Sequence, residues 1–475
     1  MQTFLAPLGE LEEYRSIKNA CEKDAGVVQI AGCMDSQKTH LIYGLSQGKK
    51  YRLILAANEL KAREIYEDYR FFDPGVLYYP AKDLIFFSAD VHGNFLVKER
   101  MQVIRALLSG EPLTVVTSID GCMDHLLPLE EMQEAALRIT QTSLVEPEAL
   151  KLRLVNMGYE RCAQVEEAGQ FAVRGGIVDI FPLTEENPYR LEFWDDEVDS
   201  IRSFDAQSQR SIENLDEITI YPASEVLLSK SRIKKGVSKM KQEADRQTAL
   251  FEKDGKIEEA GRVRRLVREL TEQLDYLDGA AGVDGFVDYF YEKTVSFLDY
   301  FPKEDTCVFL DEPNRLTEKA EAVETEFRES MAGRLEKGYL LPGQLNLLYS
   351  YKDVVMKLNR FHCTSLCMME AKSGDYKVKD SFHLEVRSVS SFNNSFELLA
   401  QELGDWKKKG YRTVLLSASR TRAKRLAEDL RGFGLNSFYS EDTDRVVQKG
   451  EILVLHGSIR RGYEYPMIRF GVLSE

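Results

Sequence analysis

The 475-residue sequence contains no apolar run that approaches the roughly 20 residues of a membrane-spanning helix. Its first residues, MQTFLAPLGELEEYRS, include acidic side chains and do not have the basic-then-apolar order of a secretion signal. The seven cysteines are scattered, which suits reduced thiols better than a disulfide framework. These absences predict a cytoplasmic protein that makes no contact with a membrane.

The sequence also lacks a convincing metal-ligand pattern and an excess of positive charge. The nearest metal candidate, HCTSLC at residues 362–367, has no second pair of ligands at the spacing of a zinc site, so we expect no metal. The 63 basic residues are outnumbered by 78 acidic residues, which gives a net charge of −15. Because non-specific DNA affinity comes from neutralising phosphates, this balance disfavours duplex DNA as a partner and favours a protein.

Parallel-sheet patterns are present in two separated parts of the chain. Short β-rich runs alternate with helical patterns in residues 1–128, and the same texture returns near residue 306, which indicates βαβ units. The clearest predicted strands are VVQIAG (27–32), YRLILAA (51–57), LTVVTSI (113–119) and TCVFLDE (306–312).

Between these parts the pattern changes to alternation with period two, which is typical of an antiparallel sheet with one solvated face. FAVRGGIVDIF (171–181) predicts two short strands joined at a pair of glycines, and YRLEFW (189–194) puts Leu191 and Phe193 on the apolar face. The solvated face then takes Arg174, Arg190, Glu192 and Trp194.

The predicted fold is a multidomain α/β protein. A parallel-sheet lobe is interrupted by a small antiparallel β-rich domain and followed by a separate, smaller α/β domain. We assign residues 1–128 and 225–350 to the two halves of the lobe, 129–224 to the inserted domain, 351–385 to a linker and 386–475 to the last domain. We also expect the natural protein to continue beyond Glu475, because that residue directly follows an apolar strand.

The stretch IAGCMDSQKTHL (30–41) nearly matches the phosphate-binding loop G-x-x-x-x-G-K-[ST]. Gly32, Lys38 and Thr39 stand at their motif positions, but Gln37 replaces the second glycine. That glycine lets the backbone approach phosphates without a Cβ clash, so Gln37 obstructs the cradle.

The second half of a nucleotide site is an acidic strand end. Asp311 and Glu312 follow an apolar strand, where Asp311 is placed to hold magnesium and Glu312 to polarise water. We interpret these residues, together with Gly32, Gln37 and Lys38-Thr39, as a vestigial nucleotide site and expect no ATP or magnesium cofactor in this part of the chain.

Two long segments carry a family resemblance. YERCAQVEEAGQFAVRGGIVDIFPLTEENPYRLEFWDDEVDSIRSFDAQSQRS (159–211) and ITIYPASE (218–225) resemble the signature that UvrB shares with the transcription-repair coupling factors (Mfd), both bacterial nucleotide-excision-repair proteins. LDYFPKEDTCVFLDEPNRL (298–316) and EKGYLLPGQL (336–345) resemble the region around the acidic ATPase motif of UvrB. The lobe is therefore similar to a degenerate RecA/UvrB-like lobe.

Three departures from UvrB favour the coupling factors. Gln37 breaks the phosphate loop, and Pro313-Asn314 follow Asp311-Glu312 where UvrB reads D-E-S-H. Residues 78–101 are also too few for the aromatic hairpin with which UvrB clamps damaged DNA. The resemblance to the amino-terminal part of Mfd covers essentially the whole chain, most weakly from about residue 350 onward.

The resemblance implies a function. This part of a coupling factor mimics UvrB and recruits UvrA to RNA polymerase stalled at a lesion. An RNA-polymerase-binding domain, an ATP-dependent DNA translocase and an autoinhibitory carboxyl-terminal domain are expected beyond it. The alternative is a nucleotide-binding, DNA-processing enzyme of the UvrB/helicase type, which Gln37 and Pro313 disfavour.

By the same resemblance, UvrA-contacting residues lie on the inserted sheet. For Arg174 the alternative is an ion pair within the domain, with Glu192 or Asp179, and for Phe181 it is a place in the core. The candidate UvrA-binding residues are Arg161, Arg174, Phe181, Arg190 and Arg202.

Overall fold

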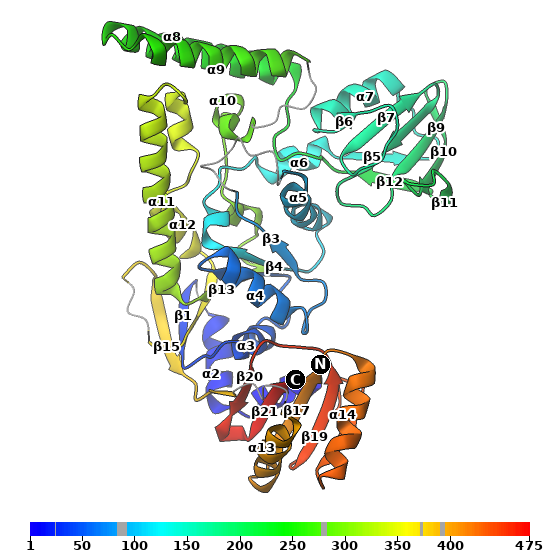
Figure 1. Cartoon of the computed structure of the whole chain (residues 1–475), viewed down its shortest axis with the longest axis vertical. Helices are drawn as coiled ribbons and strands as arrows, with labels where there is room; N and C mark the ends of the chain where they lie inside the picture. The colour runs from blue at the N-terminus through cyan, green and yellow to red at the C-terminus, as the bar shows by residue number, and fades with distance from the viewer. Residues whose placement is uncertain (24, 83–92, 277–282, 371–373, 390–394) are drawn as a thin grey trace.

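The computed structural model describes the whole chain except residues 24, 83–92, 277–282, 371–373 and 390–394. Its described residues form four sheets. A seven-stranded sheet lies in the middle of the molecule, a six-stranded sheet lies to one side, and the carboxyl-terminal sheet lies at the opposite end from a projecting helical hairpin (Figure 1).

The seven-stranded sheet is parallel throughout, which confirms the predicted α/β lobe. Strands β1, β4 and β13 are buried along their full length, as expected for a parallel sheet with both faces covered. In spatial order the strands are β15 (Val378–His383), β1 (Gly26–Ala31), β14 (His362–Cys367), β13 (Thr306–Asp311), β2 (Tyr51–Ala56), β4 (Leu113–Ser118) and β3 (Leu77–Tyr79).

The interpretation of residues 351–385 as a linker is wrong. This segment contains helix α12 (Tyr351–Leu358) and supplies two strands of the main sheet, β14 and β15. Strand β14 lies between β1 and β13 and pairs with both, so it joins the two sides of the sheet. The strand at HCTSLC was not predicted because polar residues interrupt the apolar run that is typical of a buried strand.

The inserted domain is built on a six-stranded sheet that is antiparallel except where β6 pairs with β7. The predicted strands on either side of Gly175-Gly176 and in YRLEFW are confirmed. In spatial order the strands are β11 (Ser211–Asn214), β10 (Glu197–Phe204), β9 (Tyr189–Trp194), β8 (Ile177–Ile180), β7 (Gln170–Arg174) and β6 (Glu160–Arg161). Two further strands, β5 (Leu137–Thr140) and β12 (Glu217–Ile220), pair with each other.

The carboxyl-terminal residues form a mixed sheet of their own, which agrees with a separate small α/β unit. Its central strands are parallel, and its edge strand β16 and strand β20 run antiparallel to their neighbours. In spatial order the strands are β16 (Arg387–Val389), β20 (Gly462–Tyr465), β21 (Phe470–Ser474), β17 (Arg412–Ser417), β19 (Glu451–His456) and β18 (Asn436–Tyr439).

Helices cover these sheets, and several begin at a side-chain cap. Asn58, Ser229 and Ser419 each accept a hydrogen bond from a backbone N–H in the first turn of the helix that follows. No helix in the described part of the chain is long and apolar enough to cross a membrane. The α-helices are α1 (Gln2–Leu8), α2 (Glu12–Cys21), α3 (Gln37–Leu45), α4 (Glu59–Tyr69), α5 (Gly93–Ser109), α6 (Leu129–Ala135), α7 (Pro147–Asn156), α8 (Lys230–Lys253), α9 (Ile257–Tyr276), α10 (Val287–Phe290), α11 (Pro313–Glu336), α12, α13 (Phe396–Lys408) and α14 (Arg420–Gly432).

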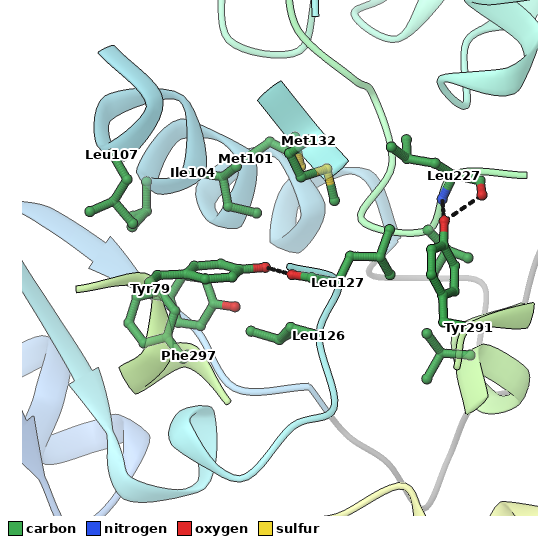
Figure 2. Packing of buried hydrophobic residues seen from close by; sticks show 14 of the residues in the cluster. Tyr79, Met101, Ile104, Leu107, Leu126, Leu127, Met132, Leu227, Tyr291 and Phe297 are labelled. Carbon is green, nitrogen blue, oxygen red and sulfur yellow. Dashed lines mark hydrogen bonds between the residues drawn. The ribbon is translucent and has the colours of Figure 1, made fainter. Parts of the chain in front are cut away.

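The largest apolar core joins the lobe to the inserted domain. Figure 2 shows Tyr79 stacked on Phe297, with ring centroids 3.7 Å apart. In the same view the Tyr291 hydroxyl donates to the carbonyl of Leu227 at 2.5 Å and accepts from its N–H at 3.1 Å. Tyr291 therefore also fixes the chain just after the inserted domain, because its buried hydroxyl bonds to both backbone polar groups of Leu227.

A buried ionic cluster fixes the same junction. Arg100, on α5, is fully buried, and its Nε lies 2.9 Å from Glu225, which follows the last strand of the inserted domain. Its Nη1 lies 3.0 Å from Asp124, and Lys82 reaches Glu225 at 2.7 Å. Burial raises the pKa of Glu225, but Arg100 and Lys82 outweigh it and hold that pKa at about 2. Charge pairing thus complements apolar packing where the inserted domain meets the lobe.

Candidate functional site

The solvated face of the six-stranded sheet brings together three of the predicted partner-binding arginines. Register sets Asp179 opposite Arg190, and Arg190 opposite Arg202. Arg174 lies on the same face, opposite Ile177 on the neighbouring strand. Side chains that face each other across strands lie about 5 Å apart, so these residues form one contiguous surface.

A buried carboxylate organises this surface. Asp179 is 0% exposed, and both of its oxygens accept hydrogen bonds from Arg190, at 2.6 and 2.9 Å. Arg174 also donates to Asp179 at 2.6 Å. The Arg174 side chain is 46% exposed and that of Arg190 only 16%. Arg190 therefore holds the sheet together, whereas Arg174 pairs within the domain and still presents much of its surface to solvent.

The other three candidates differ in their surroundings. Arg202 forms an ion pair with Glu192 and is partly exposed. Arg161 is exposed on the edge strand β6, in register with Phe171 and so out of phase with the Asp179 cluster. No ion pair of Arg161 occurs within the described ranges. Phe181 is half-buried directly after β8, so it is neither a free aromatic nor a core residue.

One strongly exposed residue of this face was not among the predicted contacts. Trp194 ends strand β9 and is 81% exposed. It lies in phase with Arg190 and Glu192 along the strand, on the same face. The sequence alternation had placed Trp194 on the solvated face, and an aromatic side chain in that phase was itself the signal of a contact surface.

The altered phosphate loop is a second cluster, at the carboxyl edge of the parallel sheet. Lys38, in the first turn of α3, has an Nζ 2.6 Å from Asp311 and 2.7 Å from Glu312, and its side chain is only 7% exposed. The structure thus brings the loop and the acidic strand end together. Burial lowers the pKa of Lys38, but the two carboxylates outweigh it, so the pKa is raised and the amine stays charged.

Two further polar groups of the loop are bound within the protein. The Gln37 side-chain carbonyl accepts a hydrogen bond from the backbone N–H of Met34 at 3.1 Å. The Thr39 hydroxyl donates to the carbonyl of Ser36 at 2.7 Å. In an intact loop, such backbone N–H groups and the Lys and Ser/Thr side chains bind phosphate and magnesium. Here protein atoms already satisfy them.

The His-Cys segment does not converge on a metal. HCTSLC forms strand β14, in which successive side chains point to opposite faces of the sheet. Cys363 and Cys367 are buried, and burial raises the pKa of both thiols, Cys367 to about 11. No group of three or more metal-ligating side chains occurs among the described residues.

The inserted domain is similar to a known protein family. Residues 137–226 match the family model of the UvrB interaction domain. This range contains the whole six-stranded sheet and the paired strands β5 and β12. The outer face with Arg174 and Trp194 therefore lies within the segment that matches the UvrB interaction domain.

Curated relatives extend the similarity over the full chain. The chain is 30% identical over 490 aligned residues to the transcription-repair-coupling factor of Bacillus subtilis (strain 168). The alignment covers 100% of the chain and 40% of that protein. It is 27% identical to the factor of Staphylococcus aureus (strain MRSA252), with 94% of the chain and 38% of that protein covered. A solved chain titled XPD_Helicase covers 95% of this chain and 80% of its own length at 10% identity and a TM-score of 0.24, too distant to bear on the fold.

The expected resemblance to the amino-terminal part of the transcription-repair coupling factors is thereby confirmed. The chain spans about 40% of the length of the curated relatives it matches.

Proposed function

We propose that this chain is the UvrB-mimicking module of a transcription-repair coupling factor and that it recruits UvrA in transcription-coupled nucleotide-excision repair. The proposal rests on the match of residues 137–226 to the UvrB interaction domain, whose sheet carries exposed side chains on one face. That face offers exposed Trp194 and half-exposed Arg174, and Trp and Arg are the residue types that dominate interface hot spots.

The proposal is tested by binding of this chain to purified UvrA, measured by calorimetry. Substituting Arg161 and Arg174 together by alanine is expected to weaken binding by about 2–4 kcal/mol if both are buried at the interface. The melting temperature is measured in parallel, because Arg174 also pairs with Asp179. Unchanged affinity in the double variant would remove both arginines from the interface, and no binding by the unmodified chain would refute the function.

We propose in addition that this chain does not hydrolyse ATP. Lys38 is held by Asp311 and Glu312, and the Gln37 carbonyl takes a loop N–H, which supports a loop without nucleotide. Calorimetry with magnesium-ATP at millimolar concentration is expected to give no binding signal. A micromolar dissociation constant would favour the alternative of a nucleotide-dependent DNA-processing enzyme.

The activities of the longer relatives remain part of the proposal. We infer that an ATP-driven DNA translocase, contacts with RNA polymerase and an autoinhibitory domain belong to the parts of the coupling factors that this chain does not cover, and that the protein acts in the cytoplasm. The predicted absence of a clamp hairpin in 78–101 falls partly on 83–92, outside the described residues. A gel shift is expected to show only weak duplex binding, with no preference for damaged DNA.

A further inference from the structure

The altered phosphate loop lies against the carboxyl-terminal α/β domain. The amide nitrogen of Gln37 donates to the hydroxyl of Tyr465, on β20, at 2.9 Å. The backbone N–H of Arg461 donates to the hydroxyl of Ser36, at 3.1 Å. The hydroxyl of Ser36 in turn donates to Asp68 at 2.7 Å. The loop thus forms hydrogen bonds with a segment that is distant in the sequence, since Gln37 and Tyr465 are 428 positions apart.

The surviving glycine of the motif is also in contact with the chain that leads to this domain. The N–H of Leu384 donates to the carbonyl of Ala31 at 2.9 Å. Gly32 has a φ of +82°, and a Cβ at this position would lie 2.0 Å from the carbonyl oxygen of Leu384. Any other residue would displace the chain at Leu384. Gly32 is therefore required by packing, with no nucleotide involved.

A chain of hydrogen bonds passes from Gln37 into the buried interior. The His40 Nε2 lies 2.9 Å from the carbonyl of Phe4, which can only accept, so Nε2 carries the proton. The His40 Nδ1 then accepts from the Tyr465 hydroxyl at 3.2 Å, and that hydroxyl accepts from Gln37. Every donor in this chain has an acceptor, and both functional atoms of the Gln37 amide are used, one on Met34 and one on Tyr465.

We propose that the loop at residues 32–39 is the docking site of the carboxyl-terminal α/β domain, residues 386–475, and that Gln37 is its specificity-determining residue. Glycine at position 37 can offer neither the carbonyl that the Met34 N–H uses nor the amide that Tyr465 uses. The replacement that spoils the phosphate cradle thus creates the contact that fixes the domain. This inference is independent of UvrA recruitment, which involves the inserted sheet.

The chain offers a direct probe of docking. It has two tryptophans: Trp406 is buried in the carboxyl-terminal domain, and Trp194 is exposed on the inserted sheet. In a Trp194→Phe background, fluorescence reports the unfolding of the carboxyl-terminal domain through Trp406. Gln37→Gly and Tyr465→Phe are each expected to lower the urea midpoint of this transition. Combining them is expected to lower it by less than the sum of the two single effects, because both remove the Gln37–Tyr465 bond, whereas the bond to Met34 is lost only with Gln37→Gly and the bond to His40 only with Tyr465→Phe.

Tyr439→Phe is the matched control. Tyr439 is in the same domain, and its hydroxyl contacts the exposed Glu441 rather than the loop, so its midpoint is expected to stay unchanged. Fully additive effects of Gln37→Gly and Tyr465→Phe, or single effects no larger than that of Tyr439→Phe, would overturn the proposal.

Hydrogen exchange gives a second measurement that does not depend on the Trp406 signal. The N–H groups of Arg460 and Arg461 donate to Asp68 and Ser36 across the docking contact. Tyr465→Phe is expected to accelerate their exchange at least about tenfold, while the amides of strands β9 and β10 in the inserted sheet exchange as before. Unchanged protection of both arginine amides would overturn the proposal, also in the event that Gln37→Gly fails to fold.

Discussion

The phosphate loop and the outer face of the inserted sheet both place cations beside carboxylates, but they leave those cations in different states. At the loop, Lys38 is almost fully buried between two carboxylates. On the sheet, buried Asp179 is shared by Arg190 and Arg174, and Arg174 keeps nearly half of its side chain in solvent. A buried cation with satisfied partners has little left to offer an outside ligand, whereas a half-exposed one can still be desolvated by a partner.

The two regions also differ in what their side chains contact. The loop retains a recognisable motif, but its polar groups form hydrogen bonds within the lobe and with the carboxyl-terminal domain. The sheet has no catalytic motif, yet it exposes Trp194 next to the arginine cluster. A motif match therefore says less about ligand binding than the number of polar groups that remain without a partner.

The largest expected effect is the loss of the buried cation at the loop. Lys38→Met leaves Asp311 and Glu312 together without their shared counter-charge, so the free energy of unfolding is expected to fall by about 3–5 kcal/mol. Urea denaturation measures it. The control is Lys61→Met, which removes a surface ion pair with Glu64 and is expected to cost about 0.5 kcal/mol or less. Equal costs for the two variants would contradict the buried pairing.

Acidification tests the docking contact through His40. Burial lowers the pKa of His40 from 6.5 to about 4, so the unfolded chain takes up a proton at a higher pH than the folded chain. The stabilisation from neutral His40 is complete above about pH 6.5 and is lost as the pH falls toward 4, by up to about 3 kcal/mol. Urea midpoints of the Trp406 transition across this range measure it. A His40→Gln variant is expected to lose this part of the pH dependence; an unchanged slope would contradict the assignment.

Substitution of Trp194 tests whether the outer face of the inserted sheet binds a partner. Trp194→Ala is expected to weaken UvrA binding by at least about 2 kcal/mol, because a large exposed aromatic ring is a typical interface anchor. The melting temperature is expected to stay constant, since the side chain is 81% exposed. Leu250→Ala, at an exposed apolar position on the distant hairpin of α8 and α9, serves as the control. Equal affinity of both variants would exclude Trp194 from the interface.

The smallest effects separate the arginines from one another. Arg174→Ala removes one of two cations from Asp179 and is expected to lower the free energy of unfolding by about 1 kcal/mol, because Arg190 still satisfies both carboxylate oxygens. Arg161→Ala is expected to change it by about 0.5 kcal/mol or less, since Arg161 is exposed. Thermal unfolding of the two variants measures this order, and a larger loss for Arg161 would show that its side chain is structurally engaged.

Much of the inserted sheet was predictable because its rules are local. Alternation alone put Arg174 and Arg190 on one face and Leu191 on the other, and the structure agrees. The same alternation named Asp179 only as one of two possible partners of Arg174. Which carboxylate was buried depended on the register between β7, β8 and β9, which local pattern does not specify.

At the phosphate loop, the sequence predicted the motif but not its long-range contacts. Spacing identified Lys38 and its acidic counterpart at the end of β13, because parallel strands end at a common edge of the sheet. Nothing near Gln37 in the sequence pointed to Tyr465. The strand character of residues 362–367 and 378–383 was equally hidden, since their place in the main sheet comes from pairing with β1.

By itself, the sequence determined the strand phases, the loop motif with its altered glycine position, and the resemblance to the coupling factors, because each depends on residue type and short spacing. The tertiary structure alone decided that Lys38 is paired with Asp311 and Glu312, that Arg190 is mostly buried while Trp194 is exposed, and that the carboxyl-terminal domain contacts the loop. These outcomes depend on burial and on contacts between distant residues, and a hydrogen bond across 428 positions exists only after the sheets have formed and packed.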